Sequence, residues 1–132
     1  MESIVLTQKE KDKLIAHAIE QQPNESCAML FGEKIDDAWN VKEVFLTENM
    51  DKSHTKFTIS PEELLKGYQL AEKMHLDLVG VFHSHPNSNT TPSDTDKKFM
   101  QNNPVPWIIF SCVTNELTAY LLDSDVIEIP IR

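Results

Sequence analysis

The sequence has no apolar run that approaches the length of a membrane span, which takes about 20 residues. Its opening, MESIVLTQKEK, lacks the basic start, the long apolar centre and the small-residue cleavage site of a signal peptide. We therefore expect a cytoplasmic protein. Basic residues are outnumbered, since 12 lysines and arginines against 21 aspartates and glutamates give a net charge of −9. This charge repels phosphates, so binding to nucleic acid or to a membrane surface is not expected.

Cysteine is also scarce, with two in the whole chain and no Cys-x-x-Cys pair. Cys27 and Cys112 each lie in an apolar run, so in a reducing compartment we expect two buried thiols rather than a disulfide. A thiolate metal site is not expected either. Internal repeats, low-complexity tracts and Pro/Ser-rich linkers are absent. The 132 residues therefore predict a single domain spanning 1–132.

Three helices are predicted, each from a residue that suits the N-cap position: Thr7, Ser60 and Ser93. For the first two, a glutamate three residues after the cap, Glu10 or Glu63, is expected to complete a capping box. Pro61, at the first helical position, adds to the second signal. The third helix is expected to run from about residue 93 to 102 and to stop before the next proline.

Strands are predicted where apolar residues run together or alternate. The predicted strands are 3–7, 26–33, 39–47, 57–59, 76–85 and the segments PWIIFSCVT, LTAYLLD and VIEIPI. The strand at 76–85 is apolar along most of its length, so we place it in the centre of a sheet. The pattern predicts a mixed α/β fold with hairpins at both ends of the chain, not a strictly alternating doubly wound one.

The stretch GVFHSHPNSNTTPSDTD, residues 80–96, carries the strongest chemical signal. Side chains two apart on a strand share a face, so His83 and His85 can lean toward one point and hold zinc through nitrogen. Asp96 falls in the first turn of the third predicted helix, where the helix dipole favours a carboxylate. It is a candidate third ligand. A fourth position would then remain for water, which zinc activates by lowering its pKa to about 7.

Simpler interpretations exist for each part of this pattern. Ser93 and Asp96 could form only an N-cap with its acidic partner, and a His-x-His pair on a strand can be structural. The two occur together at the end of one apolar strand, which favours a metal site. Capping and metal binding are also compatible in the same residues. The remaining histidines, at 17, 54 and 75, are expected to face solvent or to pack ordinarily.

The arrangement His-Ser-His, seven residues, Ser, two residues, Asp resembles the signature of the JAMM metalloproteases, the catalytic MPN+ branch of the MPN family. Pro86 is also usual in that family. The segment PNESCAMLFG resembles its glutamate-bearing strand, with Glu25 in the glutamate position and Ala28 where a glycine is common. The resemblance implies a single MPN domain, similar to cytidine deaminases, with a curved mixed β-sheet and about three flanking helices. The deaminase Pro-Cys-x-x-Cys and His-x-Glu elements are absent, so deamination is not expected.

The resemblance also implies a role for each site residue. His83, His85 and Asp96 would bind one catalytic Zn²⁺. Glu25 would be the general base that takes a proton from the zinc-bound water and delivers it to the leaving amine. Spacing alone does not single out Glu25 among the nearby glutamates. Ser93 would donate a hydrogen bond to the oxyanion of the tetrahedral intermediate.

The activity implied by the resemblance is hydrolysis of the isopeptide or peptide bond after the C-terminal Gly-Gly of ubiquitin or a ubiquitin-like modifier. The short chain favours a small stand-alone member of prokaryotic type. An extended tail could bind by adding to a sheet edge beside the site. Two alternatives are a zinc peptidase that trims the C-terminus of a sulfur-carrier protein, and a non-catalytic MPN scaffold. The modifier, the target and the oligomeric state are not specified by the sequence.

Overall fold

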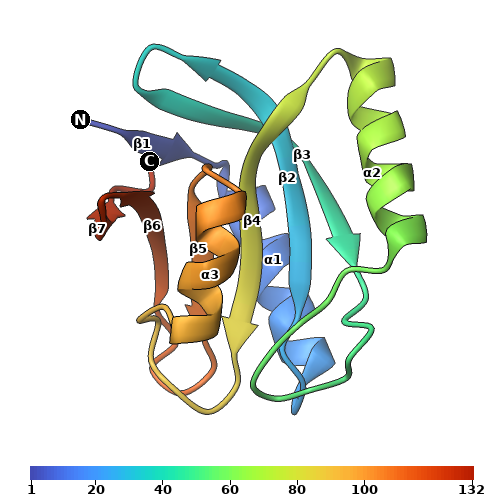
Figure 1. Cartoon of the computed structure of the whole chain (residues 1–132), viewed down its shortest axis with the longest axis vertical. Coiled ribbons are helices and arrows are strands. Elements are labelled where there is room, and N and C mark those ends of the chain that lie inside the picture. Colours follow the sequence, from blue (N-terminus) through green and yellow to red (C-terminus); the bar gives the residue numbers. More distant parts are fainter.

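A single seven-stranded sheet organises the computed structural model, which describes residues 1–132 (Figure 1). The strands are β1 (Ser3–Val5), β2 (Cys27–Ile35), β3 (Ala38–Thr47), β4 (Asp77–His85), β5 (Trp107–Ser111), β6 (Leu117–Asp123) and β7 (Asp125–Ile129). The helices are α1 (Gln8–Gln21), α2 (Pro61–Met74) and α3 (Asp94–Asn102). None of the three has the length and apolar character needed to cross a membrane.

The strand order is β1-β3-β2-β4-β5-β6-β7, which places β4 in the middle as predicted. β4 pairs antiparallel with β2 and parallel with β5, so the sheet is mixed. The helices α1 and α3 lie on opposite sides of β4 (Figure 1). On the α1 side, Leu14 and Ala18 pack into the main hydrophobic core with Phe82 of β4. On the α3 side, Met100 packs with Val81, from the alternate face of the same strand.

The sheet curves until its two ends meet, and this brings the chain termini close together (Figure 1). The backbone N–H groups of Ile4 and Leu6 donate to the carbonyls of Pro130 (3.1 Å) and Arg132 (2.9 Å). The N–H of Arg132 donates back to Ile4 at 2.8 Å. These bonds satisfy backbone groups that an edge strand would otherwise expose. The curved mixed sheet with three helices matches the predicted fold class.

The helix caps follow the sequence prediction with one exception. Thr7 Oγ1 accepts from the N–H of Glu10 (3.1 Å), and the Glu10 carboxylate accepts from the N–H of Thr7 (2.8 Å). Ser60 Oγ likewise accepts from the N–H of Glu63 (3.2 Å). The predicted capping box at α2 is nevertheless wrong. The Glu63 carboxylate accepts instead from the N–H of Glu48 (3.0 Å), because the chain leaving β3 passes beside the start of α2.

The strand predicted at 57–59 is also wrong, since these residues are part of an irregular loop between β3 and α2. The loop bonds to itself rather than to the sheet. The N–H of Met50 donates to the carbonyl of Thr58 (2.9 Å), and the N–H of Thr58 donates to Asn49 Oδ1 (3.1 Å). The apolar Phe57 that suggested a strand is buried under the loop. Its burial does not come from strand pairing.

Gly32 lies where β2 shifts register against β3, and a Cβ atom there would stand 1.8 Å from the backbone carbonyl oxygen of Asn40. We expect Gly32→Ala to lower the free energy of unfolding by about 2 kcal/mol, because two paired strands must move apart. Urea unfolding measures the change. Gly67→Ala in α2 is the matched control, since its nearest atom is the flexible Sδ of Met29 at 3.0 Å and alanine favours a helix. Equal losses in the two variants would contradict the steric explanation.

Candidate metal centre

The last residues of β4 bring the two histidines to the site. His83 and His85 share one face of the strand, and both are buried. Ser84 faces the other way, and its Oγ accepts from the backbone N–H and the hydroxyl of Ser26, each at 2.9 Å. The N–H of Ser84 donates to the Ser26 carbonyl at 3.1 Å. These three bonds join the end of β4 to the residues that lead into β2. The position of Glu25 is thereby tied to the histidine pair.

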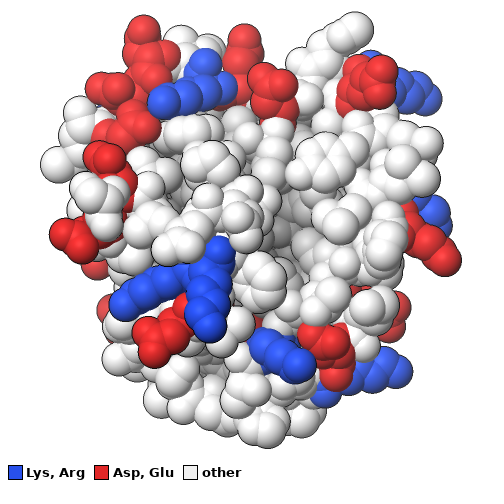
Figure 2. Space-filling model, viewed as in Figure 1, with Lys and Arg blue, Asp and Glu red and all other residues white.

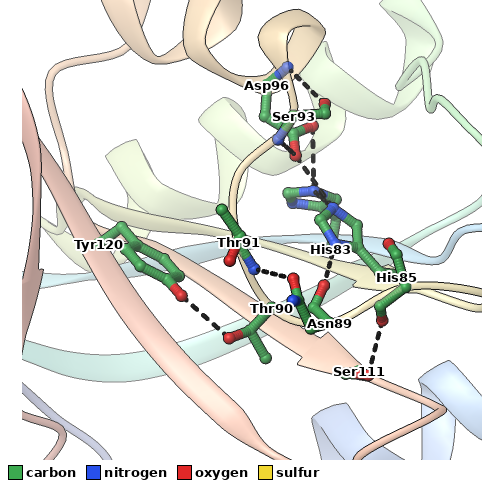
Figure 3. Close-up of polar contacts among 10 residues, drawn as sticks. His83, His85, Asn89, Thr90, Thr91, Ser93, Asp96, Ser111 and Tyr120 are labelled. Carbon is green, nitrogen blue, oxygen red and sulfur yellow. Dashed lines mark hydrogen bonds and ion pairs between the residues drawn. The ribbon is translucent and has the colours of Figure 1, made fainter.

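The first turn of α3 brings Asp96 to the same place (Figure 3). Ser93 Oγ accepts from the N–H of Asp96 at 3.0 Å, and Asp96 Oδ2 accepts from the N–H of Ser93 at 2.9 Å. This is a complete capping box that begins the helix. The same carboxylate faces the histidines. The capping and ligand interpretations of these two residues are therefore compatible in the structure. The Ser93 hydroxyl keeps its own hydrogen free to donate, and the residue is exposed.

Three potential metal-ligating side chains converge on one point. His83 Nε2 lies 3.1 Å from Asp96 Oδ1, and His85 Nε2 lies 3.0 Å from Asp96 Oδ2. The two Nε2 atoms are 3.1 Å apart. Ligands bound tetrahedrally at zinc distances stand about 3.3 Å from one another, so these spacings are close to those of an occupied site. All three predicted metal ligands are brought together, and the group suits a metal ion.

The protonation pattern of the histidines also suits a cation. His85 Nδ1 lies 2.7 Å from the backbone carbonyl of Asn89 (Figure 3). A carbonyl only accepts, so Nδ1 carries the proton and Nε2 directs its lone pair inward. His85 Nε2 lies 3.0 Å from Asp96 Oδ2. A nitrogen lone pair and a carboxylate oxygen at that distance repel each other unless a positive charge lies between them. Without an ion, that charge is a proton shared with Asp96.

The loop that supplies the Asn89 carbonyl is fastened to the sheet on both sides of it. Ser111 Oγ donates to the carbonyl of Ser88 at 2.7 Å. The hydroxyls of Thr90 and Tyr120 lie 2.9 Å apart, within hydrogen-bond distance (Figure 3). These contacts hold the carbonyl of Asn89, which accepts the hydrogen bond from His85 Nδ1. The sequence contained no signal for them, because they join residues 23 and 30 positions apart.

The charges of the site are distributed unequally. Burial alone would raise the pKa of Asp96, but hydrogen bonds from His83 and His85 hold it well below its usual range. Burial lowers the pKa of His83. Burial also acts to lower the pKa of His85, but its hydrogen bonds to Asp96 and Asn89 outweigh burial and raise it. The aspartate therefore keeps a negative charge that attracts a cation.

Glu25 is the second carboxyl group near this point. Its side chain is buried, with 3% of the residue exposed, and Oε1 has no hydrogen-bond partner. Burial raises its pKa to about 8, and the negative charge of Asp96 acts in the same direction. Glu25 thus holds a proton at neutral pH in the absence of a cation. A group that takes up and releases a proton near pH 7 is suited to acid–base chemistry.

Aromatic rings hold His83 in place. The Phe57 ring stacks on it with centroids 5.0 Å apart, and the Trp107 ring meets it edge-on at 5.6 Å. Both rings also line an apolar groove of about 250 Å³ between α2, α3 and β4. Figure 2 shows this side of the molecule hollowed, with uncharged side chains along the hollow. Phe57 was not among the predicted site residues, because its segment was interpreted as a strand.

The sheet edge predicted to receive an extended tail does not exist beside the site. β2 is paired with β3 and β4, and β4 is paired with β2 and β5. Neither strand has free backbone groups along the segment that carries the site. The apolar groove shares two of its lining residues, Phe57 and Trp107, with the surroundings of His83.

The remaining histidines and the cysteines take the roles expected of them, with one difference. His17 is buried, with Nε2 at 3.1 Å from the Cys27 carbonyl and 3.0 Å from the Thr47 carbonyl, while the histidines at 54 and 75 are exposed. Both thiols are unpaired. Burial raises the pKa of Cys27 to about 12, which keeps it unreactive. Cys112 differs from the prediction in being only partly buried.

Fold and site together define a class of protein: an α/β domain in which two histidines of the central strand and an aspartate of the following helix form a buried group near a glutamate whose pKa is raised. Residues 7–123 match the family model described as prokaryotic homologs of the JAB domain, and the chain belongs to this family. The resemblance to the JAMM proteins of the MPN family is thereby confirmed.

Two curated relatives illustrate the family. The desampylase of Pyrococcus furiosus is 34% identical over 97 residues, which cover 74% of this chain and 66% of the relative. The CysO-cysteine peptidase of Mycobacterium tuberculosis is 28% identical over 123 residues, which cover 90% and 83%. The chain thus spans just under two thirds of the desampylase and most of the peptidase.

Solved structures confirm the fold. The solution structure of a Desulfitobacterium hafniense protein has a TM-score of 0.88 at 30% identity, covering 98% of this chain and 91% of that chain. The crystal structure of a JAB1/MPN domain protein from Archaeoglobus fulgidus has a TM-score of 0.62 at 17% identity, covering 100% and 97%. The second likeness concerns the fold alone, which is the predicted MPN fold.

The raised pKa of Glu25 predicts a pH dependence of stability in protein stripped of metal. The folded state holds this proton up to pH about 8, whereas the unfolded chain releases it near 4.5. The folded state binds more protons in this window, so its stability falls as the pH rises. We expect the free energy of unfolding of the wild type, relative to that of Glu25→Gln, to fall by about 5 kcal/mol between pH 4.5 and pH 8.

Urea unfolding in the presence of a chelator, at stepped pH, measures this difference. Glutamine keeps the shape of the side chain but does not titrate, so the difference between the two proteins reports the proton of Glu25 together with its electrostatic coupling to His85. Parallel curves for the two proteins would rule out a raised pKa at Glu25.

Proposed function

We propose that this protein is a zinc-dependent isopeptidase that hydrolyses the bond after the C-terminal Gly-Gly of a ubiquitin-like modifier. The observation that carries the proposal is the convergence of His83, His85 and Asp96 within 3.1 Å of one another, with the buried carboxyl of Glu25 coupled to them. The desampylase relative supports the choice of substrate class.

Zinc is the metal we assign to the site. Two imidazole nitrogens and one carboxylate are a donor set that zinc accepts, and a fourth position stays open. When bound there, zinc supplies a Lewis acid and an activated water. The Asn89 carbonyl fixes the tautomer in which His85 Nε2 is available to the ion.

Glu25 and Ser93 do the proton transfer and the charge stabilisation. Glu25 accepts a proton from the attacking water and passes it to the leaving amine, for which a pKa raised by burial is suited. Ser93 lies in the turn that presents Asp96, and its free hydroxyl hydrogen stabilises the oxyanion of the reacting carbonyl. The apolar groove beside His83 holds the extended tail of the modifier through the residues that precede Gly-Gly.

A second candidate uses the same residues on a different leaving group. The CysO-cysteine peptidase relative favours a peptidase that trims a residue from the C-terminus of a sulfur-carrier protein. A non-catalytic scaffold is disfavoured, because the ligand set is complete and an unpartnered carboxyl is buried beside it. The two enzymatic candidates differ only in the group that follows Gly-Gly.

We also propose that residues 1–132 form one JAMM/MPN+ domain that works in the cytoplasm. One continuous sheet runs through the chain, and its ends are joined by backbone hydrogen bonds. The two unpaired thiols are suited to a reducing compartment. The partners are ubiquitin-like or sulfur-carrier proteins and their conjugates.

Metal removal and Glu25→Gln test the proposed reaction. We expect the purified protein to hold one zinc ion and to lose hydrolysis when a chelator removes it. Glu25→Gln keeps the zinc but slows turnover by about 10²–10⁴-fold, because no group remains to take the proton. Metal analysis and gel assays of conjugate cleavage measure the two effects. Glu33→Gln, on the exposed end of β2, is the matched control with unchanged turnover.

The cleavage assay presents two substrates to each protein: a Gly-Gly isopeptide conjugate and a sulfur-carrier protein extended by one cysteine. Preference for the second selects the alternative function. Full activity after chelation would refute metal catalysis, and full activity of Glu25→Gln would remove Glu25 from the reaction.

Ser93→Ala separates capping from catalysis. We expect the rate to fall by about 10²–10³-fold through loss of the oxyanion donor, with a loss of about 1 kcal/mol in stability from the missing cap. Ser60→Ala removes the equivalent cap of α2 and is the control. Steady-state kinetics and urea unfolding of both variants provide the comparison. If both variants lose the same fraction of kcat, the role of Ser93 is structural.

A further inference from the structure

Asn49 is a buried polar side chain in the irregular loop between β3 and α2, with 3% of the residue exposed. Its amide makes five hydrogen bonds. Nδ2 is a donor within hydrogen-bond distance of the carbonyls of Glu25 (3.1 Å), Ser53 (3.3 Å) and Lys56 (2.9 Å), so its two hydrogens are shared among three acceptors. Oδ1 accepts from the N–H groups of Asp51 and Thr58, each at 3.1 Å. This one side chain therefore replaces the backbone pairing that the loop lacks.

The first partner of this network is Glu25. Its carbonyl accepts from Asn49 Nδ2, and its N–H donates to the Ser53 carbonyl at 2.7 Å. Ser53 is itself held by Asn49. Both backbone polar groups of Glu25 are thus bonded to the loop rather than to the sheet, whose paired residues begin at Cys27. The place of the Glu25 backbone depends on the loop staying closed.

The second partner is the ring that covers His83. Asn49 binds the carbonyl of Lys56 and the N–H of Thr58, which are the residues on either side of Phe57. Phe57 is buried, and its ring stacks on the His83 imidazole at 5.0 Å. A single amide therefore fixes the backbone on both sides of the aromatic wall. The same amide also holds the backbone of Glu25.

From these contacts we infer that Asn49 is a positioning residue, which sets the distance between the Glu25 carboxyl and the metal-ligating histidines. The inference rests on the proposed function for its catalytic consequence. Asn49 touches neither substrate nor metal in this role. It acts through the backbone of Glu25 and through Phe57. Displacing a reacting group by about 1 Å can cost about 10²-fold in rate, so the closed loop is a condition for turnover.

An asparagine is required here because the site needs donors and an acceptor on one short side chain. Aspartate has the same shape and keeps the acceptor for Asp51 and Thr58. It has no N–H for the three carbonyls, and its charge would be repelled by them. Asn49→Asp therefore tests hydrogen bonding apart from packing, while Asn49→Ala removes both.

The experiment compares Asn49→Ala and Asn49→Asp with wild type and with Leu121→Ala. Leu121 belongs to the main core on the other side of the sheet, so its truncation lowers stability without reaching the site. We expect both Asn49 variants to keep one zinc per chain and a KM within about twofold, while kcat falls about 10- to 100-fold. Leu121→Ala keeps the wild-type kcat below its melting temperature. A kcat for Asn49→Asp equal to that of wild type would overturn the inference.

Amide hydrogen exchange gives a readout that needs no substrate. In both Asn49 variants the N–H of Glu25 exchanges at least about 10-fold faster, while β4 amides stay protected. In Asn49→Ala, which also lacks the Oδ1 acceptor, the N–H of Thr58 exchanges faster as well. Leu121→Ala speeds exchange throughout the sheet instead. If Glu25 and Thr58 stay protected in Asn49→Ala, the inference fails.

The two proposals fail separately. A wild-type protein that cleaves none of the conjugates refutes the proposed function, and the exchange result then decides the role of Asn49. An active wild type whose Asn49 variants keep full kcat leaves the function standing and refutes the positioning role.

Discussion

The backbone and hydroxyl bonds between Ser26 and Ser84 are the contact on which the rest of the site depends. They join the chain entering β2 to the end of β4, in a register that places Cys27 opposite His83. Two segments more than fifty residues apart are held side by side by this pairing. The carboxyl of Glu25, which lies just before β2, and the imidazoles at the end of β4 are thus held close to one another. A slip of one residue would turn the histidines to the α1 face.

Two carboxyl groups of the site have pKa values that are shifted in opposite directions. Hydrogen bonds from the histidines keep Asp96 charged, and that charge together with burial keeps the proton on Glu25. Environments that push two carboxyl pKa values apart are a general way of separating an anion from a proton carrier. In this protein the two pKa values differ because the two carboxyl groups lie in different surroundings. Asp96 is placed by its own helix cap, whereas Glu25 lies without a side-chain partner beneath the loop.

Irregular segments, rather than the sheet, complete this site. The loop after β3 supplies Phe57 against His83, and the loop after β4 supplies the Asn89 carbonyl to His85. Each is held by side-chain hydrogen bonds because it has no strand partner. Loops of this kind often carry functional residues, which the strands and helices hold in place. Their contacts depend on particular pairs of residues and follow no repeating pattern along the sequence. For that reason the strand prediction at 57–59 failed, although the apolar character of Phe57 was recognised.

Local rules determined what the sequence could predict by itself. Alternation along a strand places His83 and His85 on one face, capping chemistry places Asp96 in the first turn of α3, and apolar continuity places β4 at the centre. Each rule acts within a few residues, so no fold is needed to apply it. Spacing alone did not decide which glutamate lies beside the histidines, although the family resemblance indicated Glu25. Tertiary structure decided that Glu63 bonds to Glu48 and that the sheet closes on itself. Those outcomes depend on hydrogen bonds and burial between distant segments, and only the folded chain brings such segments together.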